Sequence, residues 1–214
     1  MLMQLAANPV GFFKNNPGIQ IGEPYVADAL SSGWLTEVTK TQLSYRGDKH
    51  FDLDFVPAPV LKVLVRPAPP GAKSPTRFLP FRPDCVSWMR IDPTATTVYT
   101  AQLSGCNMYV STIGTDVWLF HTNANTEADD AANARKKRSM AEAVRTRLGG
   151  TSWDLSLERG VQPFYQVGVA AGIFFGQKVV STKSGNSAWG FYLYTPDGHV
   201  HRIASSVGAT NATL

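Results

Sequence analysis

The sequence is poor in the residues that build metal centres and disulfide frameworks. It contains only two cysteines, Cys85 and Cys106, and four histidines in 214 residues. No C-x-x-C pair occurs and the histidines are scattered, so we expect no metal site, and we expect no other cofactor. Two cysteines are too few to staple a chain of this length, so the fold must depend on its core and a reducing environment is the simpler expectation.

Long apolar segments and a nucleic-acid-binding stripe are also lacking. No run approaches the length of a membrane span, and residues 1–13 are only mildly apolar and are interrupted by Asn8 and Pro9, so no signal peptide is expected. Lys and Arg exceed Asp and Glu by 20 − 16 = 4 residues. The one dense basic run, Arg135-Lys136-Lys137-Arg138, lacks the interleaved aromatics usual in nucleic-acid binders. The mild positive charge fits an acidic protein partner equally well.

What is present fits a single domain covering residues 1–214. Hydrophobic residues make up 43% of the chain, which is near the average for globular proteins and allows a sizeable core. Residues 1–58 are rich in Gly, Pro and Asn, and we predict loops, short helices and one strand there. Residues 59–204 are predicted to form a β-rich core. The expected fold class is α/β, a mixed β-sandwich flanked by a few helices.

The predicted strands are short runs rich in β-branched and aromatic residues. They cover residues 60–65, 86–90, 97–103, 107–112, 116–121, 167–175, 178–182, 188–194 and 199–203. Gly114 and Pro196-Asp197-Gly198 are typical of hairpin turns. We also place Gly176 in a loop, and we expect residues 67–75, which hold four prolines, to be a surface loop.

One helix is predicted near residues 127–148. Thr126 fits its N-cap, acidic residues follow, and Arg145 and Arg147 lie in the last turn, where they complement the helix dipole. Gly149-Gly150 ends the helix. We interpret the basic run 135–138 inside it as a solvated helix face, with docking of a partner as the alternative.

The candidate chemistry lies at Cys106 and His121. Cys106 is predicted at the beginning of one strand and His121 near the end of the next, and these places are neighbours in an antiparallel pair. The small residues of Leu103-Ser104-Gly105 let the backbone turn tightly, so that the Cys106 N–H can point into a site as an oxyanion donor. A cysteine is nucleophilic as its thiolate, which a nearby histidine favours. Taken alone, such a pair is more often a buried thiol and an ordinary histidine.

A resemblance strengthens the catalytic interpretation. The segment Tyr99-Thr100-Ala101-Gln102-Leu103-Ser104-Gly105-Cys106 resembles the active-site segment of glutamine deamidase toxins, the cytotoxic necrotizing factors and the Burkholderia lethal factor, which share an L-S-G-C motif and a downstream catalytic histidine. The spacing from Cys106 to His121, 121 − 106 = 15 residues, is similar to that of the necrotizing factors. Thr100, residues 116–121 and the segments 184–189 and 192–195 look more like the lethal factor. The resemblance runs discontinuously over about half of the chain, and residues 1–80 lie outside it.

The resemblance implies roles for particular residues. Cys106 would be the nucleophile, His121 the general base and acid, and Thr100 the group that orients His121. Leu103, Ser104 and Gly105 would form the motif loop beside the oxyanion. It also implies a fold similar to the necrotizing-factor catalytic domain.

The same resemblance implies a bacterial cytotoxin and virulence factor, secreted or delivered from a bacterium, that acts in the host cytosol. It would convert one glutamine of a host protein to glutamate through a thioester. The family's targets suggest a translation-initiation RNA helicase or a Rho-family GTPase as the substrate. We expect a monomer that requires neither nucleic acid nor a membrane.

Three alternatives remain open from the sequence. The same Cys–His pair could serve a transglutaminase, in which an amine replaces water, or a cysteine protease. The chain could also be a catalytically silent protein-binding domain that retains the loop.

Cys85 is interpreted as a structural thiol because no histidine lies near it in the sequence. His199 and His201 are interpreted as ordinary histidines because their segment offers too few metal ligands.

Overall fold

Strands dominate the fold, in keeping with the many short runs of β-branched and aromatic residues. A computed structural model of the protein describes residues 5, 7–16, 20–22, 35–39, 44–47, 51–56, 62–67, 75–80, 82–100, 102–125, 129–166, 172–182 and 184–208. For residues 20–22, 35–39, 44–47, 51–56, 62–67 and 205 it describes the backbone alone.

The described elements are short strands and two helices that differ in length. The helices are α2 (Pro9–Asn15) and α4 (Asp130–Arg147). The strands are β1 (Gln20–Gly22), β2 (Leu35–Thr39), β3 (Ser44–Gly47), β4 (Phe51–Val56), β5 (Lys62–Pro67), β6 (Thr76–Leu79), β7 (Val86–Arg90), β8 (Thr97–Thr100), β9 (Asn107–Ile113), β10 (Asp116–Thr122), β11 (Leu155–Leu157), β12 (Ile173–Val180), β13 (Ser187–Tyr194) and β14 (Val200–Val207).

These strands form three sheets. One has six strands in the order β11-β9-β10-β7-β3-β2, another has five in the order β14-β13-β12-β8-β6, and a smaller one has the order β1-β5-β4. The pairs β3–β7, β6–β8 and β1–β5 are parallel, whereas the hairpins β9–β10 and β12–β13 are antiparallel. The sheets are therefore mixed.

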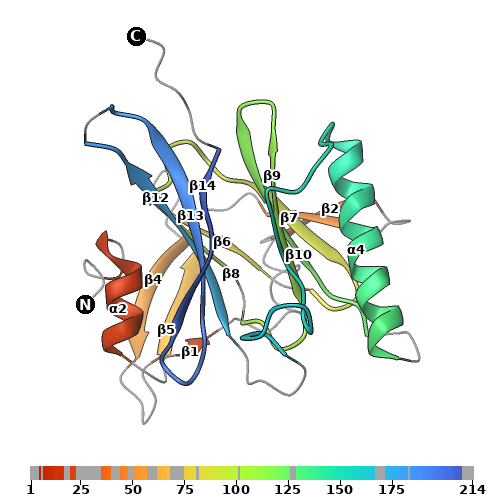
Figure 1. The fold of residues 1–214 in the computed structure, drawn as a ribbon, viewed down its shortest axis with the longest axis horizontal. Coiled ribbons are helices and arrows are strands. Elements are labelled where there is room, and N and C mark those ends of the chain that lie inside the picture. Colours follow the sequence, from red (N-terminus) through yellow and green to blue (C-terminus); the bar gives the residue numbers. More distant parts are fainter. Residues whose placement is uncertain are drawn as a thin grey trace.

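The six-stranded and five-stranded sheets pack face to face through a shared apolar core (Figure 1). Successive side chains of a strand point to opposite faces, and the inward ones make this core. From the six-stranded sheet it includes Met89, Met108, Val110 and Leu119, and from the five-stranded sheet Val98, Phe174, Phe191 and Leu193. The structure confirms the predicted fold class, a sheet-dominated α/β fold.

Each of the two large sheets carries a helix on its outer face (Figure 1). Ala141 and Val144 of α4 pack on Trp88, Tyr109 and Phe120 of the six-stranded sheet. On the other side of the molecule, Phe13 of α2 is fully buried, with its ring centroid 4.9 Å from that of Phe175 and 4.9 Å from that of Tyr194. The layers thus follow the order α2, five-stranded sheet, six-stranded sheet, α4.

The strands around Cys106 agree with the sequence-based prediction. β7 begins and ends as predicted, and β9 and β10 are each one residue longer than predicted. Gly114 forms the turn between them with a φ of +63°, a conformation that glycine adopts without steric cost. The turn at Gly198, with a φ of +88°, likewise joins β13 to β14.

Several predictions were wrong. Residues 1–58 contain β1, β2, β3 and β4, where one strand was predicted. β1 and β3 pair with β5 and β7, which lie far along the chain, and local composition does not reveal such pairing. β2–β3 and β4–β5 are antiparallel pairs of strands adjacent in sequence, which the Gly-, Pro- and Asn-rich composition of this segment did not indicate. Gly176 is not in a loop but lies inside β12. A Cβ at Gly176 would come within 2.7 Å of the Phe191 ring and 2.8 Å of Val98, so glycine there permits close packing of the core. Residues 68–74 and 167–171 of the predicted elements lie outside the described residues.

The N-cap of the long helix was also mispredicted. Asp129, with an extended backbone, caps α4, and its carboxylate accepts the N–H of Ala132 at 2.6 Å. Thr126, the predicted cap, lies outside the described residues. None of the helices in the described part of the chain is long and apolar enough to cross a membrane.

Candidate active site

Cys106 lies directly before β9, at the end of the six-stranded sheet opposite the Gly114 turn. The strand register pairs Asn107 with Thr122, which brings Asn123 opposite Cys106. The side-chain Nδ2 of Asn123 donates a hydrogen bond to Cys106 Sγ at 3.2 Å. The Asn123 Oδ1 accepts from the backbone N–H of Asp84 at 3.3 Å, which keeps the amide oxygen away from the sulfur. The sulfur therefore meets a donor, and a donor stabilises a thiolate.

His121 lies in the next row of the sheet. It is paired with Met108 on β9 and with Ser87 on β7. Because side chains alternate, His121 and Cys106 point to the same, inward face. They occupy diagonal positions on neighbouring strands, for which the separation between the two residues is about 7–8 Å and the Cβ–Cβ distance is somewhat shorter. The sequence predicted that the two places would be side by side. The register instead puts Asn123 opposite Cys106 and places His121 one diagonal step away.

Burial determines the charge state of His121. Its side chain is 1% exposed, and this burial lowers the pKa of His121 from 6.5 to about 3. Desolvation disfavours the charged imidazolium, so the ring is neutral at physiological pH. A neutral imidazole is the form that can accept a proton from a thiol or from water.

Thr100 ends β8 in the facing sheet. It is fully buried, and it shares the inward face of β8 with Val98, whose side chain belongs to the core between the sheets. Thr100 and His121 therefore face the same interior from opposite sheets. The role of Thr100 in orienting His121 stays a prediction.

The motif loop before Cys106 is held at each of its carbonyl groups. Leu103 makes a two-way backbone bridge with Gly172, at 2.7 and 2.9 Å. The next three carbonyls accept hydrogen bonds from side chains, which are Arg159 to Ser104 O at 3.1 Å, Lys137 to Gly105 O at 2.6 Å and Tyr165 to Cys106 O at 2.7 Å. A loop fixed at successive peptides is preorganised, because each planar peptide then has one orientation.

A turn over residues 158–166 covers this loop. Besides the contacts of Arg159 and Tyr165, the Arg159 N–H donates to Asn107 Oδ1 at 3.2 Å. The turn is closed by its own bonds, for example from Gly160 N–H to Tyr165 O at 2.8 Å. Cys106 is 2% exposed beneath it. A substrate can reach the sulfur only if part of this covering moves.

Cys85 lies on the far side of Asn123 and has a different character. The Asn123 N–H donates to Cys85 O at 3.1 Å, so Cys85, Asn123 and Cys106 form one row across three strands. Burial raises the pKa of Cys85 from 9.0 to about 12. Its Sγ donates to Arg82 O at 3.2 Å. Cys85 is thus a buried neutral thiol, in agreement with its structural interpretation.

Sequence reasoning missed the residues that hold the loop. The basic run was interpreted as a solvated face, but Lys137 is only 5% exposed and points at Gly105 O. Arg138 in the same run is exposed and pairs with Glu158 at 3.4 Å, at the start of the covering turn. Asn123 could have been found from the predicted hairpin, since it lies two residues after His121. No sequence signal marks Arg159 or Tyr165, because their approach depends on the path of the 158–166 turn.

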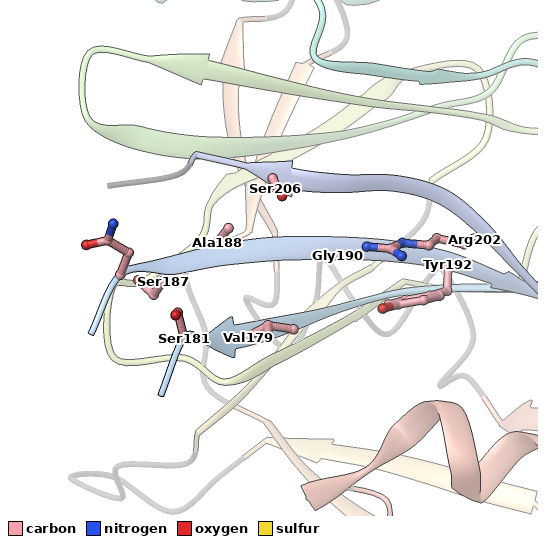
Figure 2. Close-up of a pocket in the computed structure, with 9 residues that line it drawn as sticks. Val179, Ser181, Ser187, Ala188, Gly190, Tyr192, Arg202 and Ser206 are labelled. Carbon is pink, nitrogen blue, oxygen red and sulfur yellow. The ribbon is translucent and has the colours of Figure 1, made fainter. Parts of the chain in front are cut away.

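The described part of the chain also has a pocket of about 300 Å³ on the outer face of the five-stranded sheet (Figure 2). Figure 2 shows the Arg202 side chain next to Gly190 and Tyr192 at one end of the pocket, with Ser181 and Ser187 at the other end. It lies at the end of β12, whereas the bridge from Gly172 to Leu103 lies at the beginning of that strand. The pocket is therefore separate from Cys106.

Among the described residues, no group of three or more His, Cys, Asp or Glu side chains could hold a metal ion.

No protein-family model matches the chain, and no curated protein sequence matches it. Inferences about function therefore depend on the motif and on the arrangement around Cys106.

Proposed function

We propose that the protein is a protein-glutamine deamidase in which Cys106 is the nucleophile and His121 the general base and acid. The observation that carries the proposal is the shared inward face of the two residues, one row apart, beside a loop whose carbonyls are each held. A buried cysteine of purely structural character would not need a donor on its sulfur. Cys85 is the internal comparison, because its thiol donates to a carbonyl instead.

In the first step, Cys106 Sγ attacks the side-chain amide carbon of a glutamine while the thiol proton passes to His121. The carbonyl oxygen becomes an oxyanion, for which backbone N–H groups near Cys106 and the Asn123 amide are candidate donors. The C–N bond then breaks as imidazolium gives its proton to the departing amine, which leaves as ammonia. Because burial disfavours imidazolium alone, it forms only together with the negative charge on sulfur or oxygen.

In the second step, water attacks the resulting thioester. His121 takes one proton from the water as its oxygen bonds to the carbonyl carbon. The C–S bond breaks, the thiolate recovers the proton from His121, and glutamate is released. One water is consumed and one ammonia formed in the whole cycle, with no other reactant.

We propose further that the substrate is a folded host protein and that the chain is a bacterial toxin of the necrotizing-factor and lethal-factor kind. The support is the L-S-G-C segment at residues 103–106 together with a sheet-dominated fold in which Cys106 is buried. A translation-initiation RNA helicase and the Rho-family GTPases are the candidate substrates, and the toxin would act as a monomer in the host cytosol.

The deciding experiment compares the wild type with Cys106→Ala in host cells. We expect one host protein to show glutamine-to-glutamate conversion at one site with the wild type and none with the variant, while both proteins give the same circular dichroism spectrum. Intact-mass measurement with added primary amine separates deamidation from amine transfer, and a cleaved target would indicate a protease. Equal conversion by wild type and variant would eliminate Cys106 as the nucleophile.

A further inference from the structure

We propose that Lys137 is a positioning residue of this site, which orients the Gly105–Cys106 peptide and supplies the positive charge that stabilises the anion formed at Cys106. The inference rests on the proposed function for its catalytic meaning. The contacts that carry it are independent of any substrate.

Lys137 is an unusual lysine. It lies in the middle of α4, is only 5% exposed, and donates from Nζ to Gly105 O at 2.6 Å. Lysine is almost never buried unless it is paired, and none of the ion pairs between described residues includes it. Its partner is instead the carbonyl that directly precedes the candidate nucleophile.

That contact fixes the direction of the Cys106 N–H. In a trans peptide the C=O of one residue and the N–H of the next point in opposite directions. Since Lys137 draws Gly105 O toward α4, the Cys106 N–H is aimed away from α4. Arg159 fixes the preceding peptide in the same way through Ser104 O. Two adjacent N–H groups with set directions are what an oxyanion hole requires.

Gly105 is part of the same arrangement. Its φ is +156°, and a Cβ there would lie 2.7 Å from a guanidinium nitrogen of Arg159. A side chain at this position would displace Arg159. Glycine therefore leaves room for the Arg159 side chain beside the peptide whose carbonyl binds Lys137.

The charge of Lys137 acts on the sulfur as well. Burial lowers the pKa of Lys137, and interaction with Cys106 opposes that shift, which means that the cation and the thiolate stabilise each other. The other titratable groups nearby are Asp130 on α4, Arg159 and Tyr165 on the 158–166 turn, and Cys85 and His121 on the sheet. Among these, Arg159 is only partly buried, so solvent screens its charge more than that of the buried Lys137.

A purely structural role would be to anchor α4 to the sheet. The two roles predict different results for the pH titration of the Cys106 thiolate. This titration is followed by ultraviolet absorbance as the difference between each protein and its Cys106→Ala counterpart. It is an equilibrium measurement, so the burial of Cys106 does not limit it, and Cys85 does not interfere because its pKa is about 12.

The variants are Lys137→Met, which removes both the charge and the donor, and Lys137→Gln, which removes the charge but keeps a donor. Lys137→Arg keeps the charge, and Arg135→Met removes one charge from an exposed position of the same helix. We expect the thiolate midpoint to rise by about one pH unit, a tenfold change in ionisation, in the Met and Gln variants. The Arg variant and the Arg135→Met control should stay near the wild type.

Folded Met and Gln variants with the wild-type midpoint would overturn the inference. If the Met variant does not fold, the comparison of Gln with Arg decides, and equal midpoints in those two would overturn it as well. The titration involves no substrate, so a raised midpoint without any deamidation in host cells would contradict the proposed function and leave the role of Lys137. Deamidation that is unchanged in a folded Lys137→Met variant would contradict the role of Lys137 and leave the proposed function in place.

Discussion

His121 combines a titratable ring with a position between two sheets. Histidine at such a place is bound to be neutral, because the surrounding core cannot solvate an imidazolium. In the proposed reaction this makes His121 a proton carrier that is charged only briefly. The same burial makes the histidine a source of acid sensitivity for the folded state.

We therefore predict that the protein loses stability as the pH falls below about 6.5. The folded-state pKa of about 3 lies below the ordinary value of 6.5, so in this window the unfolded chain binds a proton that the folded chain does not. Each pH unit in the window costs up to about 1.4 kcal/mol, which gives about 2 kcal/mol at pH 5. The free energy of unfolding in urea, measured from pH 7 to pH 5, tests this. His121→Gln should show a clearly shallower pH dependence, and equal slopes would contradict the prediction.

At the scale of single residues, the sequence was sufficient for the candidate nucleophile and base but not for their surroundings. Cys106 and His121 follow from a motif and from hairpin spacing. Asn123 and Lys137 contact the site because of the strand register and because α4 docks on the outer face of the six-stranded sheet. The docking of α4 depends on Trp88, a residue far from the helix in sequence. Local patterns contain no information about such contacts.

The element that matters most to the motif loop is α4, since it carries Lys137. Its beginning is set by Asp129, whose carboxylate satisfies the N–H of Ala132. The two turns between this cap and Lys137 transmit any fraying of the helix end toward the site. The cap is thus linked to the geometry of Gly105.

We predict that Asp129→Ala lowers the free energy of unfolding by about 0.5–2 kcal/mol, because one N–H at the helix start loses its acceptor. Urea unfolding followed by circular dichroism measures the loss. Asp129→Asn is the matched control, since asparagine caps about as well as aspartate. If both substitutions cost the same, the charge near the helix start and not the cap would be the cause.

Prediction at the level of elements succeeded for hairpins whose strands alternate clearly and whose turn residues are recognisable. The hairpin of β9 and β10 and the turn at Gly198 follow from alternation and from turn residues. It failed for β1 to β4, of which β1 and β3 have long-range partners in β5 and β7, and it failed at Gly176. There the small residue that suggested a loop instead makes room for Phe191.

At the scale of the whole molecule, the two outer helices play unequal parts. α4 is long and serves the candidate site, whereas α2 is short and closes the outer face of the five-stranded sheet. Phe13 fills that face with Phe175 and Tyr194. The resemblance to deamidase toxins does not extend to residues 1–80, but the fold depends on this segment because β2, β3 and β6 belong to the two large sheets.

We predict that Phe13→Ala lowers the free energy of unfolding by about 3–5 kcal/mol, the usual cost of emptying a buried phenylalanine site. Lys14→Ala, the exposed neighbour in α2, should change it by less than about 0.5 kcal/mol. Chemical denaturation of both variants decides the matter. A Phe13→Ala protein as stable as the Lys14→Ala control would show that the packing of α2 contributes little to the free energy of unfolding.

The cover over Cys106 has a consequence for the lifetime of the protein. Oxidation of a cysteine to sulfenic acid, and beyond it to irreversible products, requires that a peroxide reach the sulfur. With 2% of Cys106 exposed, peroxide meets the same barrier as a substrate. In an oxidising solution the chain would keep its thiol intact as long as the 158–166 turn stays closed. The rate at which peroxide inactivates the protein would therefore report how often that turn opens.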